Sequence, residues 1–94
     1  MDRSRLPGSE LIAQGLQDLA AGVESHAALL ILIGAPRLRR LGVVVPSASL
    51  DSVSAPEHRL YALLAAEDSD SAHSRYNALI RTLVSFERAA ECVS

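Results

Sequence analysis

The chain has 94 residues, of which 49% are hydrophobic and 21% charged, and its formal net charge is -2 at pH 7. A chain of this length forms one domain with a core near the lower size limit for stability, and its slight negative charge excludes a surface built throughout to bind phosphate. The hydrophobic residues are mostly aliphatic, with one phenylalanine, two tyrosines and no tryptophan. This composition favours packed helices over a β-sandwich, which uses more aromatic and β-branched residues.

The number of cysteines and the length of the apolar runs indicate the cellular compartment in which the protein is expected. Cys92 is the only cysteine, so the chain forms no intramolecular disulfide and no zinc site from cysteines alone. Residues 1–8 lack the apolar core of a signal peptide, and the longest apolar run is far shorter than the roughly 20 residues that cross a bilayer. We therefore expect a cytoplasmic protein that spans no membrane.

The first predicted helix follows a mobile tail. Residues 1–8 contain two arginines, a proline and a glycine without periodicity, which predicts the tail. Ser9 is the expected N-cap, with Glu10 in the first turn, where the helix dipole favours a negative charge. Apolar residues at helical spacing then predict an amphipathic helix that ends near Gly22. These residues are Ile12, Leu16, Leu19 and Val23.

Residues 27–33 form an unbroken apolar run, Ala-Ala-Leu-Leu-Ile-Leu-Ile. Ser25 can cap a helix over residues 26–33, although a buried strand would have the same pattern. Gly34 permits a left-handed end, and Pro36 suits the first position of a short third helix that reaches Leu41 and is closed by Gly42. One long helix kinked at Pro36 is the alternative. In either case the run is apolar on every side and is expected at the centre of the core or of an interface.

The second half of the chain adds an extended segment and two further helices. Val43, Val44 and Val45 have strand composition but no second strand, so we expect an extended segment on the core or an edge strand that pairs across a dimer. Residues 47–55 are a predicted serine-rich loop. Pro56 at a first helical position opens a helix to about Ala66. The polar turn over residues 67–70 then caps a C-terminal amphipathic helix. Its apolar stripe is Tyr76, Leu79, Ile80, Leu83, Phe86 and Ala90.

The expected fold is all-α, a small bundle of four to five helices over residues 1–94, with a central apolar helix and a C-terminal amphipathic helix. Amphipathic helices this few and short cannot enclose a helix that is apolar on every side, so we expect a homodimer or a protein partner to bury the excess. The function this predicts is a non-catalytic interaction or regulatory protein. The residues predicted at the interface are Leu29, Leu30, Ile31, Leu32, Ile33, Val43, Val44 and Val45.

The alternative function is a nucleic-acid-binding regulator, such as a small repressor or an antitoxin. Residues 56–88 have the order helix, short turn, helix of a DNA-reading unit, and arginines cluster at the end of the preceding helical region. Acidic residues at the turn argue against it, because they would repel phosphates. An antiparallel helical hairpin explains the same pattern. The residues predicted to contact an anion or nucleic acid are Arg37, Arg39, Arg40, His73, Arg75 and Asn77.

The chain offers few patterns that carry catalysis or bind a metal. Its three histidines lack metal-ligand spacing, no serine lies in a Gly-x-Ser-x-Gly elbow, and we expect no cofactor and no metal. Glu57, Glu87 and Glu91 have surface spacing, and Arg88 is expected to pair with a neighbouring glutamate of the last helix. The third function considered is a small enzyme whose site lies at a dimer seam. Its lining would be Arg59, His58 or Tyr76.

Overall fold

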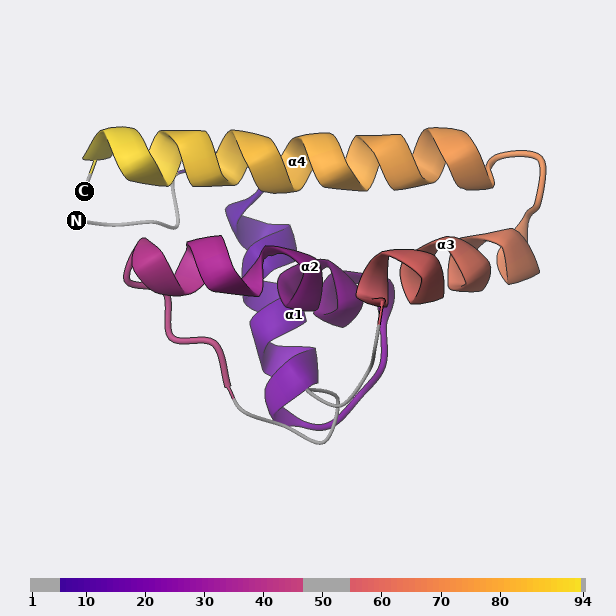
Figure 1. Ribbon diagram of the computed structural model, residues 1–94, viewed down its shortest axis with the longest axis horizontal. Helices are drawn as coiled ribbons and strands as arrows, with labels where there is room; N and C mark the ends of the chain where they lie inside the picture. The colour runs from indigo at the N-terminus through magenta and orange to yellow at the C-terminus, as the bar shows by residue number, and fades with distance from the viewer. Residues whose placement is uncertain (1–5, 47–54, 94) are drawn as a thin grey trace.

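The computed structural model describes residues 6–46 and 55–93. Within these ranges the chain forms four helices and no strand: α1 (Ser9–Ala20), α2 (His26–Arg40), α3 (Pro56–Glu67) and α4 (Ala72–Val93). Figure 1 shows α4 along the longest dimension of the molecule, with α2 and α3 following one another beside it and α1 crossing at a steep angle. The all-helical bundle is thus confirmed, with four helices. The predicted tail up to Arg5 and the predicted loop up to Ser54 lie outside the described residues.

The start of α1 differs by one residue from the prediction. Gly8, with φ of 78°, is the N-cap, and Ser9 is the first helical residue, so Ser9 is not the cap. Glycine suits this position for two reasons. It adopts the left-handed conformation without strain, and a β-carbon there would lie 2.7 Å from Cγ2 of Thr82 in α4. The close contact ties the first turn of α1 to the last helix.

Ser25 caps α2 as predicted. Its hydroxyl oxygen accepts a hydrogen bond from the Ala28 N–H at 3.1 Å and donates one to Oδ2 of Asp18 at 2.7 Å. The same side chain therefore begins α2 and holds it to the end of α1.

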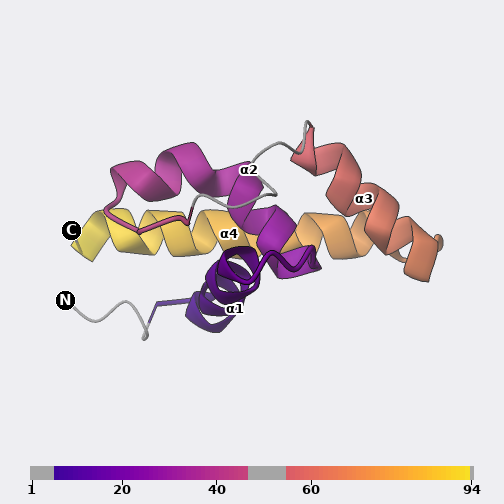
Figure 2. The same cartoon turned by 90° about the horizontal axis from the view of Figure 1, so that it is seen from below.

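The predicted break after Ile33 is wrong, and so is the separate short helix that begins at Pro36. The alternative is confirmed: α2 is one helix from His26 to Arg40 with Pro36 inside it. Figure 2 shows that its axis changes direction along its length, as proline-containing helices do. Proline removes one backbone hydrogen bond, but buried residues on both sides of it, Ile31 and Leu38 among them, keep the helix continuous against the core.

Two glycines allow neighbouring helices to approach α2 closely. A β-carbon on Gly15 of α1 would lie 2.5 Å from the carbonyl oxygen of Ala27 and 2.5 Å from Cγ1 of Ile31. Gly34 of α2 is helical, not left-handed, and a β-carbon there would lie 2.9 Å from Cδ1 of Leu83 in α4. Because α1 and α4 pack at these glycines, they cover α2 from two sides, and α3 covers a third part of it.

The core is aliphatic and centred on α2. Its largest side chains without measurable exposure come from α1, α2 and α3, and α4 adds Leu83, Phe86 and Ala90, as the predicted stripe requires. The fully buried large side chains are Leu19, Leu29, Leu30, Ile31, Leu38, Leu60 and Leu64.

Candidate interaction surface

The apolar run at residues 27–33 is largely covered by the chain itself. Leu29, Leu30 and Ile31 have no exposed surface, and only Leu32 and Ile33 at the end of the run are partly buried. The inference that the other helices could not cover this run is therefore wrong for residues 27–31. The other helices can cover the run because Gly15 and Gly34 let α1 and α4 lie closer to α2 than residues with larger side chains would. Buried in this way, Leu29, Leu30 and Ile31 are not available to a second molecule.

The segment that follows α2 leaves one valine in solvent. Val43 and Val45 are buried, while Val44 is 86% exposed, so burial alternates as it does along a strand laid on a core. The Val43 N–H donates to the Leu38 carbonyl oxygen at 3.0 Å. Within the described ranges the backbone groups of Val44 and Val45 have no hydrogen-bond partner. The segment thus lies along the core, and no residue of ranges 6–46 and 55–93 pairs with the outer side of Val44 and Val45.

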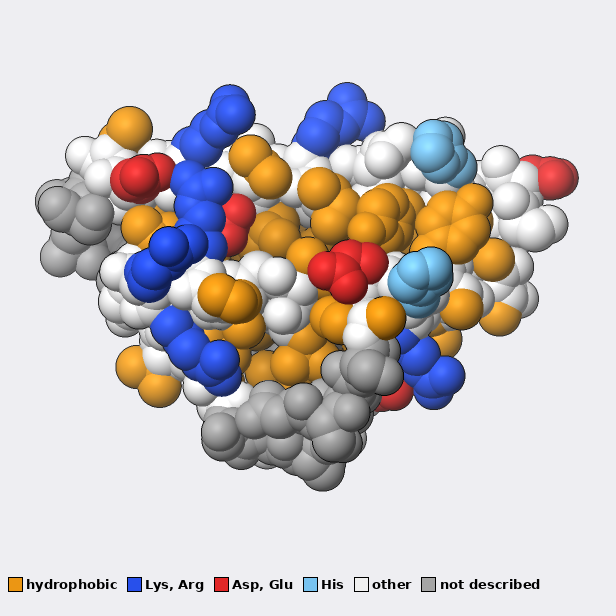
Figure 3. Space-filling model, viewed as in Figure 1, with side chains coloured by type: hydrophobic (Ala, Val, Ile, Leu, Met, Phe, Trp, Pro, Cys, Tyr) orange, Lys and Arg blue, Asp and Glu red, His pale blue; other side chains and the backbone are white. Residues whose placement is uncertain are grey.

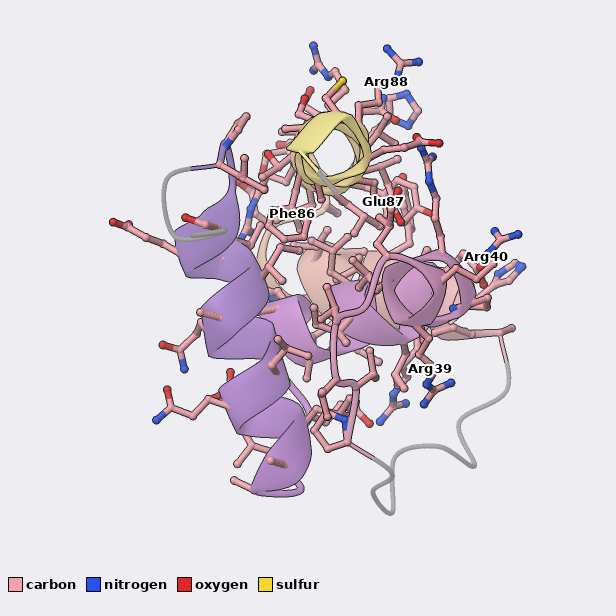
Figure 4. All side chains as sticks on the ribbon, turned by 90° about the vertical axis from the view of Figure 1, so that its left-hand side faces the viewer. Arg39, Arg40, Phe86, Glu87 and Arg88 are labelled. Atoms are coloured by element: carbon pink, nitrogen blue, oxygen red, sulfur yellow. The ribbon has the colours of Figure 1, made fainter. Side chains whose placement is uncertain are left out.

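An apolar groove lies beside Val44. It has a volume of about 550 Å³, and its walls come from α1, from the segment after α2 and from α4. The residues that line it are Ser9, Glu10, Ile12, Ala13, Leu16, Gly42, Val43, Val44 and Phe86. Figure 4 shows Phe86, one of these lining residues, on the side of α4 that faces α1. The sequence pattern placed Val44 at an interface but gave no sign of the groove, since its walls are brought together only by the tertiary fold.

Arg37 is held by two glutamates of α4. Its Nη2 donates to Oε2 of Glu91 at 2.8 Å, and its Nη1 lies 3.7 Å from Oε1 of Glu87. The pairing predicted within the last helix is not the one found for Glu91, because α2 supplies the arginine. Arg37 therefore joins α2 to α4, and its charge is already balanced within the chain.

Glu87 is buried, contrary to its predicted surface position. It is 4% exposed, and Figure 4 shows it pointing from α4 toward α2, whereas Arg88 points away from both. Burial raises the pKa of Glu87, and the positive charge of Arg37 offsets only part of that rise. The sequence does contain a signal for this burial: residue 87 lies four positions after Leu83 and three before Ala90, on the apolar stripe.

Arg39 and Arg40 are exposed and make no ion pair within the described part of the chain. Figure 4 shows both side chains directed away from the core. In the space-filling view of Figure 3, most of the visible basic side chains lie toward the left-hand end of the molecule. Of the three clustered arginines, these two are the ones free to meet an anion.

The predicted nucleic-acid contacts at the start of α4 are engaged with other side chains. His73 and Asn77 share a hydrogen bond at 3.1 Å, and Arg75 donates to Oε1 of Glu67 at 3.2 Å. Nε2 of His26 lies 2.7 Å from the other oxygen of Glu67. Desolvation acts to raise the pKa of Glu67, but the Arg75 hydrogen bond and the charge of His26 outweigh it, so the pKa lies below its ordinary value.

The residues suggested for an enzyme site are only partly together. His58 and Tyr76 line one small cleft between α3 and α4, whereas Arg59 turns away and binds Glu24 at 2.7 Å. Among residues 6–46 and 55–93, no group of three or more histidine, cysteine, aspartate or glutamate side chains is arranged to hold a metal ion. None of the helices described combines the length and the apolar character needed to cross a membrane.

No protein-family model, curated protein or solved structure matches this chain.

Proposed function

We propose that this protein is a non-catalytic interaction protein that works as a homodimer, and that the two copies meet through Val44 and the groove beside it. The observation that carries the proposal is the exposure of Val44. At 86% it is the most exposed large apolar side chain in the described ranges, ahead of Val23 at 49%. A valine in this position contributes nothing to the core of its own chain, and with the adjoining apolar groove it forms an exposed apolar surface, which favours contact with another molecule.

The position of the groove supports a second copy as that molecule. A two-fold dimer needs a surface that is complementary to itself, with a protruding group and a recess on the same face. Val44, which is 86% exposed, lines the groove together with Ile12 and Leu16 of α1, so an exposed apolar group and a recess lie on the same face. In such a dimer Val44 of each copy enters the groove of the other.

The backbone beside Val44 favours the same arrangement. Unpaired N–H and C=O groups along an extended segment can pair with a like segment from a second chain. Val44 is the exposed apolar side chain of this segment, so pairing would bury it and satisfy backbone groups together.

The association free energy of a dimer sets how much apolar surface the interface must bury. A dimer that forms at micromolar concentration needs about 8 kcal/mol of association free energy. Burying the two copies of Val44 supplies roughly 3 kcal/mol, at about 1.5 kcal/mol each. The groove walls must therefore be buried too, which explains why the proposal requires the groove as well as the valine.

The test is sedimentation equilibrium over concentrations of roughly 1 to 100 µM. We expect the wild-type chain to be a dimer and Val44→Asp to be a monomer with an unchanged circular dichroism spectrum. Val23→Asp is the matched control, since it places the same charge at the other exposed valine, in the turn between α1 and α2. A monomeric wild type, or a Val44→Asp variant that dimerises as strongly as Val23→Asp, would refute the proposal.

A further inference from the structure

The two tyrosines of the chain face one another between α3 and α4. The ring centroids of Tyr61 and Tyr76 are 5.8 Å apart and the rings are inclined at 63°, an edge-to-face arrangement. In such a pair the edge of one ring meets the face of the other, so one aromatic face is left for a third group. Tyr61 is 40% exposed, which leaves part of its ring open to solvent.

The tyrosine pair borders an open cleft of about 450 Å³, whose lining also includes Glu57, His58 and Ala62. Glu57 and Tyr61 are four residues apart on α3, so they lie on the same face of the helix. The cleft therefore offers a carboxylate next to aromatic rings, a combination that attracts a cation through both the charge and the electron-rich ring faces.

No cation of the described chain occupies this cleft. The two arginines nearest in sequence are bound elsewhere, because Arg59 donates to Glu24 at 2.7 Å and Arg75 donates to Glu67 at 3.2 Å. Glu57 has no ion pair within residues 6–46 and 55–93. The carboxylate is thus available to a positive group from outside the chain.

We propose that this cleft, formed by Glu57, Tyr61 and Tyr76, binds the guanidinium group of an arginine side chain presented by a partner protein. A guanidinium is flat, so it can stack on a tyrosine face while its N–H groups donate two parallel hydrogen bonds to one carboxylate. An anionic group would be repelled by Glu57. A purely apolar group would leave the carboxylate without a partner, and it would gain less than a cation from the ring faces.

The experiment follows the ring signals of the tyrosines by NMR during a titration at one fixed pH. Because the chain has only two tyrosines, these signals report directly on the cleft. The probe is N-acetyl-argininamide, and the matched control probe is N-acetyl-citrullinamide, which has the same shape without the charge. We expect a saturable shift of the tyrosine signals with the arginine probe and binding at least about threefold weaker with the citrulline probe.

Two variants test the role of the carboxylate. Glu57→Gln is expected to weaken arginine binding about threefold and to remove most of the difference between the two probes. Glu10→Gln makes the same change in the first turn of α1, outside the cleft, and is expected to bind like the wild type. Val44→Asp is also expected to bind normally, so this inference and the proposed dimer can fail separately. The proposed arginine site would be overturned by any of three results. These are an unshifted tyrosine signal, equal binding of both probes, and a Glu57→Gln variant that binds as Glu10→Gln does.

Discussion

The crossing of α1 over α2 at Gly15 can be tested by adding a single methyl group. In Gly15→Ala the new β-carbon would lie 2.5 Å from the carbonyl oxygen of Ala27. Nonbonded carbon and oxygen atoms approach to about 3.3 Å, so the two helices must separate by roughly 0.8 Å. A backbone oxygen cannot rotate away as a side chain can, and the cost falls at the upper end of the ~1–3 kcal/mol typical of overpacking.

The intrinsic preference of alanine for helix opposes this cost by about 1 kcal/mol. The expected net loss for Gly15→Ala is therefore about 2 kcal/mol, which lowers the melting temperature of a chain of this size by roughly 8 to 16 °C. Gly34→Ala is the matched variant, because the atoms its β-carbon would meet belong to side chains, at 2.9 to 3.3 Å. There the overpacking cost of about 1 kcal/mol is offset by the helix preference, and the stability stays near that of the wild type.

The assay is thermal and urea unfolding followed by circular dichroism at 222 nm. Gly15→Ala should melt well below both the wild type and Gly34→Ala. Equal stability of Gly15→Ala and the wild type would refute the close crossing of α1 on α2, and with it the explanation of how the chain covers its own apolar run.

Two further predictions concern charged side chains. Substitutions at Glu87 and Glu67 should respond to pH in opposite directions. The raised pKa of Glu87 means that the folded state favours the protonated carboxyl, so Glu87→Gln should be more stable than the wild type at neutral pH. That advantage should shrink as the pH falls through the raised pKa and be gone below the ordinary glutamate value of 4.5. The lowered pKa of Glu67 means that the folded state favours the charged carboxylate, so Glu67→Gln should be less stable at neutral pH, and the deficit should vanish as the pH falls through the lowered pKa. Urea unfolding at a series of pH values checks both signs, and curves that shift in the same direction would contradict them. In addition, any duplex DNA binding by the patch should involve only Arg39 and Arg40, giving a plot of log affinity against log salt with a slope of about -2. The double variant Arg39→Glu, Arg40→Glu should abolish that binding in a filter or fluorescence assay, and a slope steeper than about -4 would show that other residues contact phosphate.

Local signals in the sequence were sufficient for most of the helix boundaries. Ser25 caps its helix, Pro56 occupies a first helical position, and the spacing of apolar residues predicted which face of α4 is buried. Each of these depends on residues within a turn or two of one another, where hydrogen bonding and periodicity act.

Features that depend on distant residues could not be predicted in the same way. Pro36 and Gly34 look like a helix end by local rules, but packing against α4 keeps α2 continuous through them. The self-coverage of the apolar run depends on Gly15, whose role is visible only when α1 lies across α2. Glu87 is an intermediate case. Its spacing from Leu83 and Ala90 indicates a buried position on the apolar stripe, but a charged side chain favours a surface position, and the surface was predicted.

The meeting of two chains at Val44 is tested most directly by a disulfide between them. In a Val44→Cys, Cys92→Ser chain the cysteine at residue 44 is the only thiol, and a bond between two copies forms only if their α-carbons come within about 7 Å. Under mild oxidation we expect rapid formation of a species at twice the monomer mass of 10.0 kDa, while Val23→Cys in the same Cys92→Ser background stays monomeric on a nonreducing gel. Equal and slow cross-linking of the two variants, or none at residue 44, would contradict it.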